Sequence, residues 1–299
     1  MTLLTGQQVT GTSTRTYSVE VPADPPGAQV PAILVFHGGG QDAEVIARRW
    51  GIDPPAPVPG PLQDYLLVFP ETHPGLAEQW VHRGPSDGGL PSLDLDFVAE
   101  LLAELTTHPY PTGSAAVPEV TPDPDLVYAA GFSNGGGLVW QLLNSDLSAE
   151  FRGFAAGGKA LDPEKSLHYR RQLAASGIVP LPAPVYYLQG TADRGYRPPF
   201  TLEEEQLDHT LPFFTLTEMV ARNGLTAGPA STTLVPGSAG VTEVVLQLFT
   251  GAEAYLHGTV INGGHNWPTP TTRGNPPVAD HFDATQTIVE FWQTHAGLA

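Results

Sequence analysis

The feature that most constrains this chain is a serine between two glycines, placed where an apolar run meets a segment compatible with a helix. The run Leu126–Ala130 predicts a buried strand, and Gly131-Phe-Ser133-Asn-Gly135 follows it directly. A helix is expected over Leu138–Leu143. Strand, tight turn and helix in this order present a serine hydroxyl at the edge of a sheet, and a Cβ atom at either glycine would collide with its neighbours. We therefore predict that Ser133 is a nucleophile rather than part of an ordinary turn.

Segments typical of strands and of helices alternate along the chain, which favours a mostly parallel central sheet flanked by helices. The predicted strands are Arg15–Val21 at an edge, Ala32–Phe36, Tyr65–Phe69, Phe154–Ala156, Val185–Leu188, Val244–Phe249 and Tyr255–Ile261. The predicted helices are Ala43–Trp50, Ser92–Leu105, Leu211–Asn223 and Asp283–His295. Residues 112–124 resemble a linker but are too few to separate domains. We expect one α/β domain over residues 1–299.

A serine nucleophile needs a base to accept its proton and an acid to orient that base. Asp193 is the candidate acid, because it lies on a glycine-containing loop just after the predicted strand Val185–Leu188, where ligand sites of such sheets form. A turn aspartate that bonds its own backbone is the alternative interpretation. Asp208 is a rival, but it belongs to an acidic run that is typical of a solvated surface.

His265 is the candidate base, in the segment Asn262-Gly-Gly-His-Asn-Trp-Pro268 between the last predicted strand and the last predicted helix. The resulting chain order, serine, aspartate, histidine, is typical of this architecture. His281 is the rival, but two neighbouring aspartates and a helix start explain it as a capping or surface residue.

A loop of three glycines after the strand Ala32–Phe36 predicts donors for the oxyanion of a tetrahedral intermediate. We assign one donor to the backbone of Gly39 and the other to Asn134, the residue after the nucleophile. A phosphate-binding loop is excluded because no Lys-Ser or Lys-Thr follows the glycines, and a dinucleotide fingerprint is excluded by their spacing.

Composition excludes several other classes of function. The chain carries 31 acidic and 13 basic residues, a formal net charge of −18, which disfavours nucleic acids and anionic membranes as partners. It has no cysteine, so thiol catalysis and thiolate metal sites are impossible. His37, His73 and His82 lie in successive loops without metal-ligand spacing, and we expect no metal. No secretory signal pattern is visible, so we expect a cytoplasmic protein or a mature secreted form.

Five segments together resemble a known family: Tyr17–Val21, Ile33–Gln41, Val127–Gly136, Gln189–Asp193 and Gly263–Pro268. They are similar to the poly(3-hydroxybutyrate) depolymerase and feruloyl esterase group of α/β-hydrolases, and the resemblance runs from about Tyr17 to Phe291. Gly-Gly-His-Asn-Trp-Pro is its most specific part. The resemblance implies an α/β-hydrolase fold, and it places the catalytic and oxyanion roles on the residues already chosen: Ser133, Asp193, His265, Gly39 and Asn134. Secreted members often have a cysteine where this chain has Gly39.

These observations predict a serine carboxylic-ester hydrolase that works through an acyl-enzyme and needs no cofactor. We expect Trp80 and Trp267 to border the substrate cleft, with ordinary packing as the alternative for each. Acyl transfer to an acceptor other than water, or a non-catalytic binding protein on the same scaffold, are the competing functions. The sequence leaves open the oligomeric state and the natural ester, which ranges from hydroxyalkanoate oligomers through aryl esters and acetylated sugars to synthetic polyesters.

Overall fold

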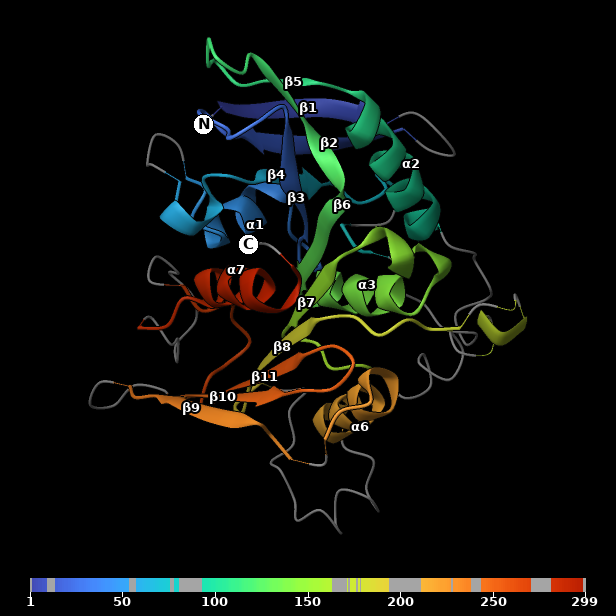
Figure 1. The fold of residues 1–299 in the computed structure, drawn as a ribbon, viewed down its shortest axis with the longest axis vertical. Coiled ribbons are helices and arrows are strands. Elements are labelled where there is room, and N and C mark those ends of the chain that lie inside the picture. The colour runs from blue at the N-terminus through green and yellow to red at the C-terminus, as the bar shows by residue number, and fades with distance from the viewer. Residues whose placement is uncertain are drawn as a thin grey trace.

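The described part of the chain folds around one 11-stranded sheet with helices on both faces (Figure 1). The computed structural model describes residues 2–9, 14–53, 58–75, 78–80, 93–162, 171, 173–175, 177, 179–193, 211–226, 228–237, 243–269 and 281–297. Within these residues, no helix has the length and apolar character that a membrane span requires.

Parallel strands form the centre of the sheet. In spatial order they are β4 (Leu66–Pro70), β3 (Gln29–Phe36), β6 (Glu119–Phe132), β7 (Gly153–Gly157), β8 (Val185–Gly190) and β11 (Tyr255–Val260). Every residue of β4, β7 and β8 is buried, as expected for strands covered on both faces. Antiparallel strands complete the two sides: β2 (Arg15–Val21) and β1 (Thr2–Val9) beside β4, and β10 (Val244–Phe249) and β9 (Ser231–Val235) beside β11. The short β5 (Tyr110–Pro111) pairs with β6.

Two hydrophobic cores hold the helices against opposite faces of the sheet (Figure 1). Helices α1 (Ala43–Arg49) and α7 (Ala284–His295) cover one face. Helices α2 (Leu93–Thr107), α3 (Asn134–Leu143) and α6 (Leu211–Asn223) cover the other. Side chains of β6 alternate between the cores, as the two-residue period of a strand requires: Ala129 faces α3, and Ala130 faces the opposite side. The short 3-10 helices Gly60–Leu62 and Asp146–Glu150 lie in loops.

The structure confirms the predicted fold and corrects parts of it. The predicted strand Arg15–Val21 and helix Leu211–Asn223 have the observed bounds. The predicted edge position of Arg15–Val21 is wrong, because β2 pairs with β1 on one side and with β4 on the other. Residues 112–124, which resemble a linker in composition, contain the start of β6 at Glu119. The edge strands β1 and β9 were not predicted; β9 is mostly exposed and lacks the apolar run that marks a central strand.

Candidate active site

Ser133 lies in the sharp turn between β6 and α3, in the strand, turn and helix context that the sequence predicts. Its backbone has φ 55° and ψ −114°, a strained conformation for a residue with a side chain. Its N–H donates to Gly157 O at 2.7 Å, which ties the turn to the neighbouring strand. A Cβ atom at Gly135 would lie 2.1 Å from Phe36 O, so glycine is required for α3 to approach β3 this closely.

His265 stands between the Ser133 hydroxyl and the Asp193 carboxylate. Its Nε2 lies 2.8 Å from Ser133 Oγ, and its Nδ1 lies 2.5 Å from Asp193 Oδ2. The Asp193 side chain is buried, whereas 43% of the His265 side chain is exposed. The structure therefore brings together three residues, of which the first, Ser133, and the last, His265, are 132 positions apart in the sequence.

Hydrogen-bonding capacity fixes the tautomer of the imidazole. A carboxylate oxygen only accepts, so Nδ1–H donates to Asp193. Nε2 then carries the lone pair and accepts a hydrogen bond from the Ser133 hydroxyl. This is the arrangement in which a histidine can act as a general base toward a serine.

Gln189 and Tyr187 support Asp193 from the buried side, and the sequence alone predicts no role for either residue. Gln189 Nε2 donates to Asp193 Oδ2 at 2.8 Å, and Tyr187 OH donates to Gln189 Oε1 at 2.9 Å. The signal for Gln189 was its place in the same segment as Asp193; the signal for Tyr187 was its two-residue spacing from Gln189 along one strand.

Two of the three glycine amides after β3 have hydrogen-bond acceptors among the described residues. Gly38 N–H donates to Gln41 Oε1 at 3.2 Å, and Gly40 N–H donates to Glu78 O at 3.0 Å. Among the described residues, no acceptor is found for Gly39 N–H. A Cβ atom at Gly39 would lie 3.5 Å from Asn134 Cβ, so the two predicted oxyanion donors belong to adjacent backbone segments.

His37, whose side chain is buried, forms a hydrogen bond to the backbone of this glycine loop. Its Nδ1–H donates to Gly38 O at 2.8 Å, and its Nε2 faces Glu71 Oε2 at 3.6 Å. Burial lowers the pKa of His37 and raises the pKa of Glu71, which favours a neutral imidazole. Since the carbonyl and N–H of a trans peptide point in opposite directions, fixing Gly38 O directs Gly39 N–H away from His37.

Trp80 and Trp267, which we expect to border the substrate cleft, both have buried side chains that belong to the core, and this burial favours packing. Trp80 is 2% exposed, and its indole N–H donates to His37 O at 2.9 Å. Trp267 is 1% exposed; it stacks on Trp50 and donates to Thr285 Oγ1 at 3.0 Å. Packing, the alternative interpretation, explains both.

The rival candidates lie just before α7 or outside the described residues. His281 precedes α7, whose N-cap is Asp283. Asp208 and His82 lie outside the described residues. Within the part of the chain that the structure describes, no three His, Asp or Glu side chains are grouped as metal ligands.

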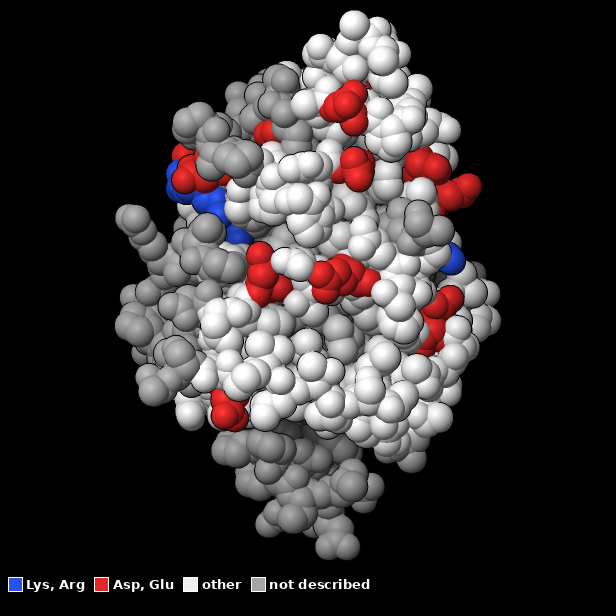
Figure 2. Space-filling view, turned by 60° about the vertical axis from the view of Figure 1, so that its left-hand side comes forward, with Lys and Arg blue, Asp and Glu red and all other residues white. Residues whose placement is uncertain are grey.

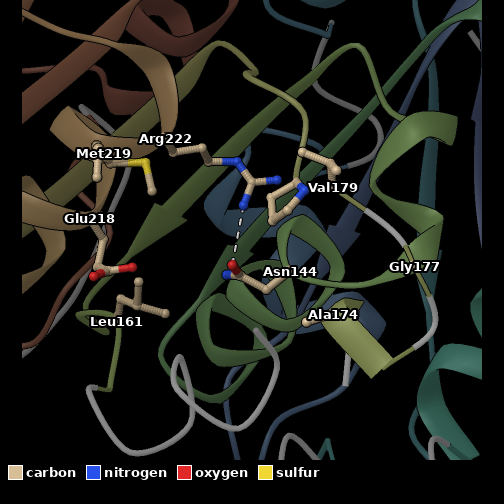
Figure 3. Close-up of a pocket in the computed structure, with 10 residues that line it drawn as sticks. Asn144, Leu161, Ala174, Gly177, Val179, Glu218, Met219 and Arg222 are labelled. Atoms are coloured by element: carbon tan, nitrogen blue, oxygen red, sulfur yellow. Dashed lines mark hydrogen bonds between the residues drawn. The ribbon is translucent and has the colours of Figure 1, made fainter. Parts of the chain in front are cut away.

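A cavity of about 550 Å³ lies at the opposite end of α3 from Ser133 (Figure 3). Asn144, the C-cap of α3, lines it, whereas Ser133 is the N-cap, so the two are about 16 Å apart at 1.5 Å per residue. Figure 3 shows Arg222 reaching from α6 to Asn144 Oδ1, at 3.1 Å. Because Arg222 also donates to Leu143 O at 2.6 Å, it caps the end of α3.

Comparison with known proteins shows the fold to which this arrangement belongs. No protein-family model matches the sequence. Two solved structures match nearly the whole chain with a TM-score of 0.51: S-formylglutathione hydrolase (FrmB) from Staphylococcus aureus, at 10% identity over 97% of this chain and 95% of that one, and acetyl xylan esterase from Aspergillus awamori, at 11% identity over 89% and 94%. The chain has the α/β-hydrolase fold. In α/β-hydrolases the nucleophile, acid and base follow one another in the order in which Ser133, Asp193 and His265 occur here.

One further protein matches only part of the sequence, but at a higher identity than these two structures. Over 124 residues, 40% of this chain, the sequence is 37% identical to a protein of Nocardia uniformis subsp. tsuyamanensis that bears the name "Putative esterase NocK". The matched part spans 30% of that protein's length.

Proposed function

We propose that this α/β-hydrolase is a serine carboxylic-ester hydrolase. The observation that carries the proposal is the imidazole of His265, which lies within hydrogen-bond distance of both the Ser133 hydroxyl and the Asp193 carboxylate. The partial match to a protein named as an esterase supports the same class of reaction.

The reaction begins when His265 Nε2 takes the hydroxyl proton and Ser133 Oγ attacks the ester carbonyl carbon. The carbonyl π bond opens, and its electron pair moves onto oxygen as a tetrahedral oxyanion. His265 then gives its proton to the leaving alcohol as the bond to that alcohol breaks, which leaves an acyl group on Ser133. Water, deprotonated by His265, attacks the acyl carbon and forms a second oxyanion. As this oxyanion collapses, the bond to Ser133 Oγ breaks, His265 returns the proton to Oγ, and the carboxylic acid leaves. Asp193 stabilises the imidazolium that forms in each half of the cycle.

Two backbone amides are the candidates for holding the oxyanion. Gly39 N–H has no acceptor among the described residues, and the backbone of Asn134 is adjacent to it. Removing one such donor from a serine hydrolase costs about 10²–10³ in turnover. We assign Gly39 and Asn134 to this role.

The surface charge argues against polyanionic substrates. On the face in Figure 2, Asp and Glu side chains are spread over the surface and Lys and Arg atoms gather near its sides. Together with the net charge of −18, this acidity repels polyanions such as nucleic acids. Trp80 and Trp267 are the aromatic residues expected at the cleft, and both are buried. Neither side chain therefore supports a preference for an aryl acyl group.

Covalent labelling tests the proposal. A fluorophosphonate probe should attach to Ser133, and Ser133→Ala should lose both the label and the turnover of 4-nitrophenyl esters while its circular dichroism spectrum stays unchanged. Asp193→Asn is the companion variant, with strongly reduced turnover. Retained turnover in Ser133→Ala, or labelling of another serine, would overturn the assignment.

A further inference from the structure

We propose that Gln189 is a positioning residue for the acid of the site, and that Tyr187 fixes the orientation in which Gln189 works. This inference rests on the proposed function, since it concerns how Asp193 is held for His265. It adds two residues to the site that neither the three-residue arrangement nor the oxyanion loop includes.

The first support is the sharing of one carboxylate oxygen. Asp193 Oδ2 accepts from His265 Nδ1 at 2.5 Å and from Gln189 Nε2 at 2.8 Å. A carboxylate oxygen has two lone pairs, so both bonds can form at once. The amide therefore holds the same atom that orients the imidazole.

The second support is the polarity of the chain of hydrogen bonds. The Gln189 oxygen can only accept, so the hydroxyl of Tyr187, 2.9 Å away, must be the donor. That bond leaves the NH₂ end of the amide toward Asp193. A flipped amide would face the carboxylate with its oxygen and the hydroxyl with its NH₂ group, and it would lose the attraction to Asp193.

The third support is burial and rigidity. Gln189 is 3% exposed and Tyr187 is fully buried, and both belong to β8. Residues two apart on a strand project from the same face, so the strand itself sets the distance between hydroxyl and amide. A buried polar side chain with both ends of its amide occupied holds one geometry, which is what precise orientation of a base requires.

The experiment measures kcat and KM for a 4-nitrophenyl ester in three variants. Gln189→Leu removes the amide, Gln189→Glu replaces the donor with an acceptor of nearly the same shape, and Tyr187→Phe removes only the orienting hydroxyl. We expect kcat to fall by about 10-fold in Gln189→Leu and by less in Tyr187→Phe, with KM little changed, as for loss of a hydrogen bond to a charged group. Tyr255→Phe is the matched control, since its buried hydroxyl bonds to His257 rather than to Asp193, and its kcat should equal that of the parent protein.

Gln189→Glu tests the proposal through the pH dependence of kcat/KM, which a purely structural role of Gln189 would leave unchanged. At neutral pH two carboxylates would face each other and repel, whereas at lower pH they can share one proton, which restores a donor to Asp193. The ratio of variant to parent kcat/KM should therefore rise as pH falls from about 8 to about 5. A ratio that is constant with pH would overturn the proposal.

A double-mutant cycle decides whether Gln189 acts through Asp193. In an Asp193→Ala background, Gln189→Leu should cause no further loss of kcat. An equal further loss would mean that Gln189 acts on the fold alone and would refute the inference. Unchanged kcat in every variant, with Ser133→Ala inactive, would refute the positioning role and leave the esterase proposal standing; turnover in Ser133→Ala would refute both.

Discussion

Replacing Trp80 with phenylalanine tests whether this side chain holds the glycine loop after β3 or touches the substrate. The indole N–H donates to His37 O at 2.9 Å, and the ring packs against Phe36 and His37 with centroids 5.3 and 5.1 Å away. The Trp80 backbone also bonds to the Asn134 side chain, through Trp80 N–H to Oδ1 at 2.6 Å and Nδ2 to Trp80 O at 3.3 Å. Trp80 thus links the two segments that carry the proposed oxyanion donors.

The expected size of the effect follows from these contacts. Trp80→Phe leaves the buried carbonyl of His37 without its donor, which costs about 1–3 kcal/mol. The smaller ring adds a void, so we expect the free energy of unfolding to drop by about 2–4 kcal/mol in all. The two backbone bonds to Asn134 remain. Turnover should therefore fall by about 10-fold, less than the 10²–10³ for complete loss of an oxyanion donor.

The assay compares kcat and KM for 4-nitrophenyl esters of increasing acyl length, with urea unfolding measured in parallel. A loop anchor should lower kcat by the same factor for every ester. Trp140→Phe is the matched control, because this indole is also 2% exposed and donates to a backbone carbonyl, Lys159 O, at 2.7 Å. The control should lose stability without losing kcat. A rise in KM that grows with acyl length at constant kcat would refute the structural assignment and restore Trp80 as a substrate contact.

Three further predictions concern the fold and its pH dependence. Asp94→Ala should lower the free energy of unfolding by about 3–5 kcal/mol in urea, because it leaves the fully buried Arg15 guanidinium without its carboxylate partner; a loss below about 1 kcal/mol would contradict this. Burial lowers the pKa of His257 from 6.5 to about 4. Between these pH values the unfolded chain binds a proton at His257 that the folded protein does not bind. The free energy of unfolding should therefore fall as pH drops through this range, by at most about 3 kcal/mol. Unfolding curves at pH 7 and pH 4.5 should show a smaller drop for His257→Asn, and an equal drop would argue against the assignment. Gly158→Ala should reduce kcat, because φ is +64° and the new Cβ would lie 3.0 Å from His265 Cε1; unchanged kcat would mean that the imidazole tolerates the contact.

The sequence predicts the centre of this fold well and its edges poorly. Strands such as Leu66–Pro70 are buried on both faces, so they appear as apolar runs that need no tertiary information. The edge strand Ser231–Val235 is mostly exposed, and its pairing with β10 rather than its composition makes it a strand. The first half of β6 contains Pro122 and Pro124, which normally argue against a strand; here Pro122 pairs in register with Val30 of β3.

At the candidate site, chain order and glycine loops were sufficient to select Ser133, Asp193 and His265 for testing. They could not show the orientation of Trp80, because its partner His37 lies 43 residues earlier and the contact exists only in three dimensions. Gln189 lies only four residues from Asp193, but the direction of its amide, on which its role depends, is set by the fold. A side chain whose function is to hold another carries no signal in the type or spacing of residues beyond its place beside that residue.

The glycines near the three side chains explain why residue types alone would not make the site. A Cβ atom at Gly190 would lie 2.3 Å from Gly263 O, so the loop that carries Asp193 and the loop that carries His265 touch through their backbones. Ala192 N–H donates to the same Gly263 O at 2.8 Å. Any larger residue at position 190 must push the two loops apart, and a 2.5 Å hydrogen bond between Asp193 and His265 tolerates little displacement. Close backbone contact is therefore a condition for the geometry in which His265 reaches both Asp193 and Ser133.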